Sequence, residues 1–370
     1  MTAAVHLDVT ELVRRPIGTG IQRVEWELIH HWPESSALVP VIASPIGFLT
    51  LPRDTLAGCS RLSGWRRLAA VLRPLRADPA ALRLLNAELF FDAVRARCYT
   101  DLIAVGAGAV GWILHDFLPW LRPRYFAPGA PRRGMPYLQA LRVVPHVAHV
   151  SEQTRSHYEQ RIMRGRGRPG PVITLGGDGL GLPRQHFSPQ RNRYVAFGTL
   201  EPRKNVAAVL EAFAGLWAAG CTAELVVAGM LREGTQREAM WLSRLRAEPR
   251  LRYLGHADDA TLREVLAGAR AAIFASEHEG FGLPPVEALN AGIPVIASAR
   301  IPSIAMLAPG GQIRLERIDA AALAAAVRRL QDDATAARLW REAAALPVRS
   351  WRDFTAEVAS WVLDMPRRTA

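Results

Sequence analysis

The sequence predicts an α/β protein built of two Rossmann-like, doubly wound domains that face each other across a cleft. Short runs of β-branched and aromatic residues alternate along the chain with stretches of helical periodicity, which is typical of parallel α/β architecture. This alternation is lost once, over residues 182–189, where prolines cluster, and then resumes. The chain has 370 residues, 49% of them hydrophobic, which is enough for two cores of ordinary size.

The first domain is expected over residues 1–187. Its predicted strands are residues 5–9, 38–42, 101–105, 110–115, 146–151 and 172–174. Helices are expected to begin after Gly20 and after Glu152. Residues 52–97 are rich in arginine and leucine and predict helix, but nothing in them indicates a role.

The second domain is expected over residues 188–349. Its predicted strands are residues 194–197, 224–228, 252–254, 271–275 and 294–297, with a late helix over 319–329. Residues 350–370 predict an amphipathic helix with aromatic anchors that packs back on the first domain. The carboxyl ends of both sheets would then meet at the cleft, where such folds bind ligands.

The composition predicts a cytoplasmic protein. No stretch approaches the ~18 uninterrupted apolar residues of a membrane span. The first eight residues lack the basic and then apolar pattern of a signal peptide. The three cysteines, Cys59, Cys98 and Cys221, are far apart and odd in number, which argues against a disulfide framework or a zinc site.

The net charge of +12 is concentrated in the first half of the chain. Residues 1–190 carry 23 arginines against 14 acidic residues. Such a surface could meet an anionic membrane, a phosphorylated substrate or nucleic acid, or could be solvated with no partner. No recognition helix, zinc finger or RNA-binding motif is present, so no specific nucleic acid is expected. Peripheral binding to the inner membrane face stays open.

Lys204 is the only lysine in the chain, beside 45 arginines. Because arginine holds nearly every other basic position, this lysine suggests a site that needs a compact ammonium. A predicted strand and a turn precede it, and Asn205 is expected to cap the helix that follows. Arg203 and Lys204 at a helix N-terminus predict an anion site, with phosphate as its natural occupant. The alternative is a lysine left by chance on a solvated face.

The richest pattern lies over residues 276–297. A predicted strand leads into a Gly280-Phe281-Gly282 loop, then into a helix that begins near Leu283 with two prolines, then into another strand. Prolines suit the first turn of a helix, and glycines let the backbone approach a ligand closely. The helix N-terminus offers free N–H groups and positive dipole, so this stretch predicts a seat for nucleotide phosphates.

Two glutamates flank this helix entrance. Glu279 lies in the loop and Glu287 lies on the helix, eight positions later. Carboxylates suit hydroxyl groups, so ribose and sugar are natural partners. If neither glutamate binds a ligand, Glu287 would interact with the helix dipole and Glu279 would be a charged residue of the loop.

These motifs resemble those of the retaining GT-B glycosyltransferases of family 4, the group 1 glycosyl transferases. The resemblance is strongest over residues 194–300, where Glu279 and Glu287 match the family's paired glutamates separated by seven residues. It implies that Glu287 binds the ribose. It also implies that Glu279, with the backbone of 280–283, contacts the donor sugar and phosphate.

The cationic pair departs from the family in one respect. Arg203 and Lys204 look like the family's pair on the diphosphate, but many members place the arginine several residues earlier, where this chain has Gly198. The adjacent Pro-Arg-Lys-Asn form is similar to a subgroup that makes bacterial surface polysaccharides. That likeness suggests GDP-mannose as the donor, with UDP- and dTDP-sugars still open.

Two further motifs are expected near the cleft. Gly18 and Gly20 lie in a loop between the first strand and a helix, and the corresponding loop of the family lies beside donor and acceptor. His115 and Asp116 end a predicted strand and look similar to the His-Asp pair on the family's acceptor side. Without such a role, Asp116 would cap the next segment and His115 would be structural.

The chain contains no Asp-x-Asp motif, so no metal and no other cofactor is expected. The cationic pair and the helix N-terminus would have to stabilise the departing nucleoside diphosphate. No carboxylate nucleophile for double displacement is evident either. The resemblance implies transfer with retention, by same-face attack of the acceptor hydroxyl.

The leading hypothesis is therefore a hexosyltransferase that uses a nucleotide-sugar donor and a glycan or lipid-linked saccharide acceptor in surface polysaccharide biosynthesis. A second hypothesis is another enzyme on this scaffold, either a nucleotide-sugar epimerase or a phosphorylase with pyridoxal phosphate on Lys204. A third is a non-catalytic binder of nucleotide sugars or nucleic acid.

Overall fold

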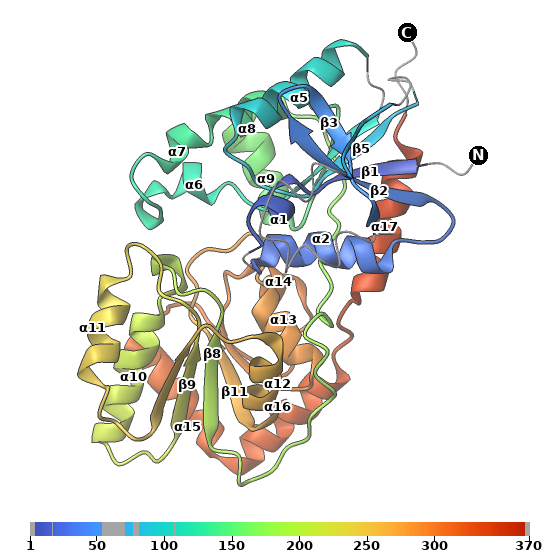
Figure 1. The fold of residues 1–370 in the computed structure, drawn as a ribbon. Coiled ribbons are helices and arrows are strands. Elements are labelled where there is room, and N and C mark those ends of the chain that lie inside the picture. The colour runs from blue at the N-terminus through green and yellow to red at the C-terminus, as the bar shows by residue number, and fades with distance from the viewer. Residues whose placement is uncertain (1–3, 17, 54–70, 77–80, 107–108, 367–370) are drawn as a thin grey trace. The chain divides into compact units, whose positions relative to one another are not determined.

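The computed structural model describes residues 4–16, 18–53, 71–76, 81–106 and 109–366 (Figure 1). The chain forms two compact units. Unit 1 comprises Met1–Phe117, Gly129–Leu175 and Trp351–Ala370, and unit 2 comprises Leu118–Pro128 and Gly176–Ser350. Residues 118–128 and 176–187 thus group with unit 2, whereas the sequence predicts a boundary after residue 187.

Unit 1 is built on a seven-stranded sheet in the order β4-β3-β2-β1-β5-β6-β7. Its strands are β1(Ala4–Asp8), β2(Ala37–Ser44), β3(Gly47–Thr50), β4(Arg73–Pro74), β5(Arg83–Asn86), β6(Ala109–Leu114) and β7(His146–His149). β1, β2, β5, β6 and β7 are parallel, while β3 and β4 pair antiparallel at one edge. The strand order reverses between β1 and β5, which makes the carboxyl ends of these two strands the switch point of the sheet.

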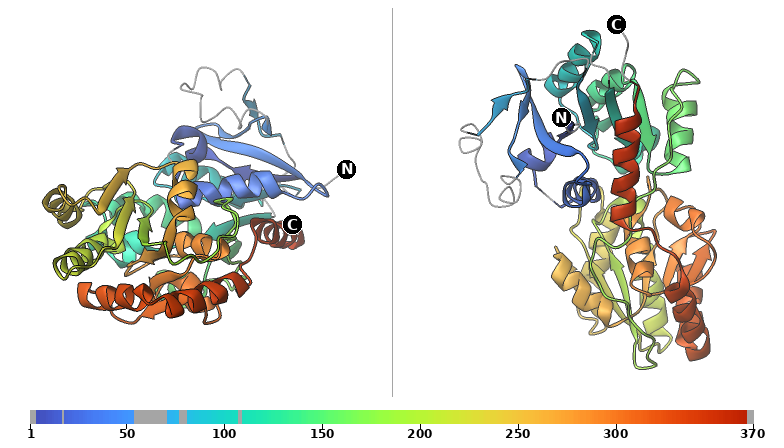
Figure 2. Two further views of the ribbon diagram at one scale, coloured as in Figure 1. Left: turned by 90° about the horizontal axis from the view of Figure 1, so that it is seen from below. Right: turned by 90° about the vertical axis from the view of Figure 1, so that its right-hand side faces the viewer.

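Several helices of unit 1 begin at a residue whose side chain accepts a backbone N–H of the first turn. The helices of this unit are α1(Thr10–Arg14), α2(Gly20–His31), α5(Ala93–Ala104), α7(Ala130–Arg133), α8(Met135–Leu141), α9(Glu152–Ser156), the π-helical segment η2(His157–Ile162) and α17(Trp351–Asp364). The Thr19 side chain accepts the Gln22 N–H at the start of α2, as an N-cap residue does. The C-terminal helix α17 lies beside α2 (Figure 2). Its Trp351 and Phe354 side chains are completely buried.

Unit 2 has a fully parallel six-stranded sheet in the order β10-β9-β8-β11-β12-β13. Its strands are β8(Arg193–Phe197), β9(Glu224–Ala228), β10(Leu251–Gly255), β11(Ala269–Phe274), β12(Val295–Ser298) and β13(Gln312–Leu315). Its helices are α6(Leu118–Leu121), η1(Pro123–Tyr125), η3(Pro202–Lys204), α10(Val206–Ala218), α11(Gln236–Arg244), α12(Asp259–Ala267), α13(Leu283–Asn290), α14(Pro302–Met306), α15(Ala320–Gln331) and α16(Asp333–Ala345). The order reverses between β8 and β11, so a ligand crevice is expected at their carboxyl ends.

Both faces of the unit 2 sheet are covered, as the doubly wound prediction requires. Tyr194 and Val195 are adjacent on β8 and fully buried, yet they belong to different cores. Tyr194 packs in one core with Phe213 of α10, and Val195 packs in the other with Leu289 of α13. Successive side chains of a strand point to opposite faces, so two cores follow from a single apolar run.

Two strand predictions for the first domain are wrong. Residues 101–105 lie at the end of α5, because Asp92 caps that helix by accepting the Val94 N–H at 2.8 Å and buried residues recur along it at helical spacing. Residues 172–174 form only a single bridge, from Val172 to His149. The strand that fills the sheet instead is β5, within the 52–97 segment predicted as helix; residues 54–70 and 77–80 of that segment lie outside the described residues.

A buried charged cluster occupies the switch point of unit 1. Arg95 of α5 is fully buried and pairs with Asp8 at the end of β1 (Nε to Oδ2, 2.7 Å) and with Glu88 (Nη1 to Oε2, 2.5 Å). Tyr99 also donates its hydroxyl to Asp8 Oδ2, at 2.6 Å. Burial and the neighbouring Glu88 carboxylate raise the pKa of Glu25 well above its usual range, so Glu25 keeps its proton.

We expect Glu25→Gln to stabilise the protein more at pH 8 than at pH 5. In the unfolded chain Glu25 loses its proton near pH 4.5, whereas the folded protein retains it to higher pH. Folding stability therefore falls as pH rises through this window, and glutamine removes that loss. Melting temperatures at both pH values measure the effect, with exposed Glu34→Gln as the control. An equal shift at both pH values would contradict a protonated Glu25.

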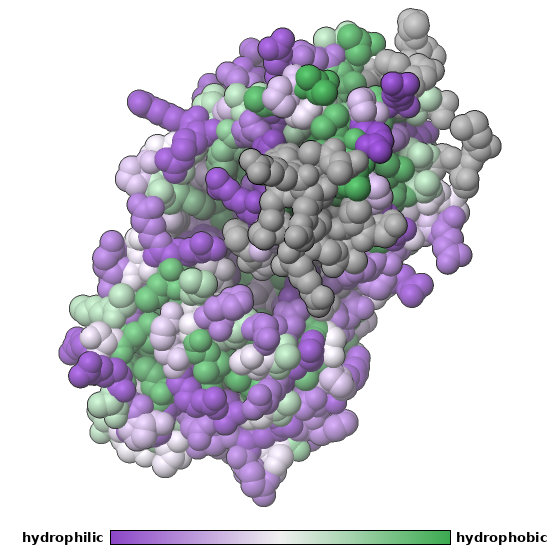
Figure 3. All heavy atoms as spheres, viewed as in Figure 1, coloured by the Kyte–Doolittle hydropathy of each residue, from purple (hydrophilic) through white to green (hydrophobic). Residues whose placement is uncertain are grey.

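The surface gives no sign of a membrane-spanning element. Among the described residues, no helix combines the length and the apolar character needed to cross a bilayer. Hydrophilic side chains are spread over the visible face of both units rather than gathered in one patch (Figure 3).

Candidate nucleotide phosphate site

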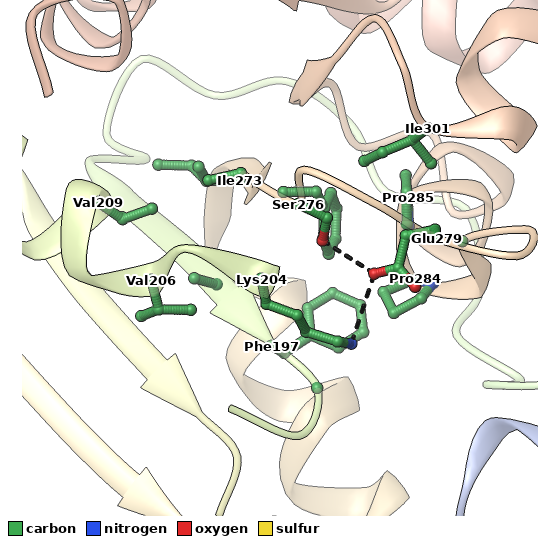
Figure 4. A pocket seen from close by; sticks show the side chains of 15 residues that line it. Phe197, Lys204, Val206, Val209, Ile273, Ser276, Glu279, Pro284, Pro285 and Ile301 are labelled. Carbon is green, nitrogen blue, oxygen red and sulfur yellow. Dashed lines mark hydrogen bonds and ion pairs between the residues drawn. The ribbon is translucent and has the colours of Figure 1, made fainter. Parts of the chain in front are cut away.

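A pocket in unit 2 lies at the carboxyl ends of β8 and β11, where the strand order reverses (Figure 4). Its polar wall includes Lys204 from η3 and Ser276 and Glu279 from the segment after β11. Gly198 and Gly282 line it with backbone, and Pro284 lines it at the start of α13. The side chains of Lys204, Ser276 and Glu279 point toward one another in Figure 4.

Arg203 and Lys204 converge on the same carboxylate. Arg203 Nη1 lies 2.5 Å from Glu279 Oε2, and Lys204 Nζ lies 3.9 Å from Glu279 Oε1. Arg203 is oriented further by Glu201 (Nε to Oε2, 2.7 Å) and by the His278 carbonyl at 2.9 Å. All three converging side chains are between 13% and 16% exposed, so a weakly screened cationic pair is held in one place.

Glu279 is ionised in this setting. Its burial by itself would raise the pKa, but the charges of Arg203 and Lys204, and hydrogen bonds from Arg203 and Ser276, outweigh burial and lower the pKa of Glu279 below its usual range. Ser276 Oγ donates to Glu279 Oε1 at 2.9 Å. Glu279 can therefore act as a hydrogen-bond acceptor for hydroxyl groups, and it is unsuited to donate a proton.

Gly198 leaves room for the Lys204 ammonium. Its φ of +108° lies in the region that side chains rarely adopt, and an added Cβ would lie 3.0 Å from Lys204 Nζ. The position that carries arginine in many relatives of the resembled family thus lies directly beside the lysine. With Arg203 reaching the same carboxylate from the adjacent position, the chain keeps two cations at the site.

The glycine loop before α13 is fixed by Ser303 of α14. Gly282 has a φ of +95°, and an added Cβ would lie 2.4 Å from Ile301 Cγ2. Ser303 donates its N–H to the Phe281 carbonyl at 2.9 Å and its hydroxyl to the Gly282 carbonyl at 2.7 Å. Pro284 and Pro285 have no backbone N–H, so in the first turn of α13 the N–H groups that could face an anion are those of Leu283 and Val286.

The other predicted residues of this loop do not line the pocket. Phe281 is 7% exposed and belongs to the apolar interior, Gly280 is buried, and Leu283 is the first residue of α13. Glu287 is 6% exposed on α13 and is also absent from the pocket wall. The ribose role of Glu287 stays a prediction.

The predicted residues of unit 1 lie at the ends of β6 and at the start of α2. Burial lowers the pKa of His115 to about 4, and its Nε2 lies 2.7 Å from the Ala87 carbonyl. His115 is therefore neutral near pH 7, with the proton on Nε2. Asp116 follows it and is partly exposed. Gly18 donates its N–H to Gln22 Oε1 at 2.8 Å, and Gly20 begins α2.

Three contributions were not foreseen from the sequence. Ser276 orients Glu279, and its position directly after β11, three residues before the glutamate, was the available signal. Ser303 holds the glycine loop from 21 residues away, and no local pattern indicates such a contact. The prediction for Asn205 is wrong in detail: it lies at the N-cap with φ of 51°, but its side chain donates to the Ile318 carbonyl and does not cap α10.

No metal-ligand cluster accompanies these residues. Within the described parts of the chain, no three His, Cys, Asp or Glu side chains are grouped so that they could hold an ion.

Comparison with known proteins agrees with this geometry. Residues 182–346 match the family model for glycosyl transferases group 1. The serotype-specific mannosyltransferase WbdA of Escherichia coli is 27% identical over 327 residues, which is 80% of this chain and 37% of WbdA. The O-antigen chain mannosyltransferase B of Escherichia coli is 33% identical over 151 residues, 40% of this chain and 38% of that protein. The crystal structure of Anabaena Alr3699/HepE in complex with UDP-glucose has a TM-score of 0.67 at 14% identity, covering 97% of this chain and 99% of that chain.

These likenesses carry different weight. The chain spans a little over a third of the length of the WbdA proteins that it matches. The structural likeness extends over nearly the whole chain, but at 14% identity it bears on the fold alone. Residues 182–346 of the chain thus match the group 1 glycosyl transferases, and its two α/β units have the GT-B fold.

Proposed function

We propose that this protein transfers a hexose from a nucleotide-diphosphate sugar to a glycan or lipid-linked saccharide in surface polysaccharide biosynthesis. The observation that carries the proposal is the convergence of Lys204, the Arg203-paired Glu279 and the N-terminus of α13 on one pocket at the switch point of unit 2. The names of WbdA and of O-antigen chain mannosyltransferase B make mannose the first candidate sugar. The UDP-glucose in the HepE structure keeps UDP-sugars among the candidate donors.

The chemical contribution of this site is charge stabilisation. When the bond between the anomeric carbon and the phosphate oxygen breaks, its electron pair leaves with the nucleoside diphosphate. Lys204, Arg203 and the amides of α13 are placed to stabilise that developing charge, without a resident metal ion. Glu279, already ionised, would accept hydrogen bonds from hydroxyl groups of the donor sugar.

We propose that the anomeric configuration is retained. The acceptor hydroxyl would attack from the face that the diphosphate leaves, and its proton would pass to the departing phosphate oxygen. Neutral His115, with a pKa of about 4, is too weak a base to hold that proton at pH 7, but its Nδ1 can accept a hydrogen bond from an acceptor hydroxyl. The neighbouring Asp116 would accept a hydrogen bond from a second hydroxyl group of the acceptor.

The test is a ligand screen followed by an assay of transfer. UDP, GDP, dTDP and ADP are compared by thermal shift, and then the sugar nucleotides of the base that binds. We expect one base to stabilise the protein, transfer to a saccharide acceptor to survive EDTA, and NMR to show the donor's anomeric configuration in the product. Absence of any nucleotide effect, with pyridoxal phosphate or random DNA binding instead, would end the proposal.

The proposed ribose role of Glu287 predicts a specific loss. Glu287→Gln should lower kcat/KM for the donor about 10- to 100-fold, because a hydrogen bond to a charged group contributes about 1.5–3 kcal/mol. The measurement compares the natural donor with its 2′,3′-dideoxyribose analogue. Wild type should discriminate between them and the variant should not. Equal discrimination by both proteins would place the ribose elsewhere.

Binding to an anionic membrane is a separate proposal, which rests on the excess of arginine in residues 1–190. Co-sedimentation with liposomes should rise with anionic lipid content and fall with salt; sedimentation independent of anionic lipid would refute it.

A further inference from the structure

A second pocket, of about 410 Å³, opens at the carboxyl ends of β11, β12 and β13 in unit 2. Glu277 and His278 line it after β11, Arg300 lines it after β12, and residues 316–319 line it after β13. Arg124 of η1 completes the wall. The volume lies within the ~300–1,000 Å³ of small-molecule sites, and the carboxyl edge of a parallel sheet is where such sites occur.

The two pockets share one short segment of chain. Ser276 and Glu279 line the phosphate pocket, while Glu277 and His278, between them, line the second pocket. The Glu277 N–H is donated to the Arg203 carbonyl at 2.8 Å, which ties this segment to the cationic loop. Residues 276–279 therefore contribute side chains to the walls of both pockets.

The charges of the second pocket are balanced. Three arginines line it, and so do three carboxylates: Arg124, Arg300, Arg317, Glu277, Glu316 and Asp319. Some are already paired, as Arg317 is with Asp319 at 3.1 Å. Among the described residues, neither the Arg300 guanidinium nor the Glu316 carboxylate has a hydrogen bond or ion pair. One strong donor and one strong acceptor are thus available in a pocket without excess charge, which disfavours a phosphate and suits a hydroxyl-rich ligand.

His278 adds a neutral donor to this wall. Arg122 Nε donates to His278 Nε2 at 3.2 Å, so the imidazole proton lies on Nδ1. Burial and the charge of Arg122 lower the pKa of His278, which keeps the ring uncharged near pH 7. The Tyr125 ring packs against this imidazole at 5.9 Å between centroids, which fixes its orientation.

We propose that this pocket is a saccharide subsite, which holds a sugar ring of the acceptor. This inference rests on the proposed transferase function and assigns part of acceptor recognition to unit 2. Arg300 and the His278 Nδ1–H donate to ring hydroxyls, and Glu316 accepts from them. Ile318 is the apolar side chain of the lining, against which the ring's carbon face packs.

The experiment uses the full chain with Glu316→Gln and Arg300→Met. Each variant should raise the acceptor KM about 10- to 100-fold, because each removes charged hydrogen bonds worth about 1.5–3 kcal/mol. The donor KM and the slow hydrolysis of donor by water should stay at wild-type values. Arg328 is exposed on α15, and Arg328→Met is the control, which should leave the donor KM, the acceptor KM and the hydrolysis rate unchanged.

Binding is measured separately by saturation-transfer NMR with methyl α-mannoside, α-linked mannobiose, methyl α-glucoside and maltose. At least one of these should give a signal with wild type that Glu316→Gln abolishes. Unchanged acceptor KM with normal donor turnover would overturn the subsite and leave the proposed function standing. Displacement of the saccharide signal by millimolar inorganic phosphate would also overturn the subsite, because it would identify the pocket as an anion site. Absence of donor turnover in wild type would instead count against the proposed function.

Discussion

Lys204→Met should lower kcat for donor turnover by about 10²- to 10³-fold, the usual loss when a group that stabilises transition-state charge is removed. Lys204 Nζ faces the pocket at 3.9 Å from Glu279 Oε1, and Arg203 keeps its ion pair with that carboxylate when the ammonium is removed, so folding loses little. The free energy of unfolding should stay within about 1 kcal/mol of wild type. Steady-state kinetics and urea unfolding of the same preparation measure both quantities.

Lys204→Arg provides the sharper control. Arginine would restore the charge, but its planar fork is longer and larger than the compact ammonium and would not place its donors at the position of Lys204 Nζ. We therefore expect Lys204→Arg to remain far below the wild-type rate. Full activity in Lys204→Met, or in both variants, would remove Lys204 from the mechanism.

Arg95→Met should destabilise unit 1 by about 3–5 kcal/mol, because it leaves Asp8 and Glu88 buried without their cation. Both carboxylates are 1% exposed or less, so water cannot replace the guanidinium. The melting temperature should fall by roughly 10 °C for a unit of this size. Differential scanning calorimetry measures the loss.

Arg97→Met is the matched control on the same helix. Arg97 pairs with Asp101 at 3.3 Å, but their side chains are 82% and 67% exposed, so this pair contributes about 0–1 kcal/mol. A combined Arg95→Met and Asp8→Asn variant should recover part of the loss. If Arg95→Met were as mild as Arg97→Met, the buried cluster would not be what holds the switch point of unit 1 together.

The second unit could be predicted from the sequence far better than the first. Its central strands β8, β9, β11 and β12 are short, mostly buried apolar runs that stand out between the helices, and only β13 was not predicted. In unit 1, residues 101–105 contain a short apolar run that resembles a strand in the sequence, but this run is the end of helix α5. The real strand β5 has only four residues, and its first is an arginine.

The site was predictable where its parts are close in sequence. Gly198, Arg203 and Lys204 lie within seven residues, and Glu279, Gly282 and Pro284 within six, so each half was visible as a motif. The contacts that assemble the halves are long-range. The pairing of Arg203 with Glu279 spans 76 positions. The second pocket is formed by the segments that follow three different strands, β11, β12 and β13.

The most direct test of a diphosphate held by Lys204 uses the fact that the chain has one lysine. Protein grown with lysine labelled with ¹³C at Cε gives a single ε-methylene resonance, from Lys204. Titration with the nucleoside diphosphate that raises the melting temperature most should shift this resonance, and the corresponding nucleoside should not. If the diphosphate stabilises the protein while the Lys204 resonance does not move, the phosphates bind elsewhere and the account is wrong.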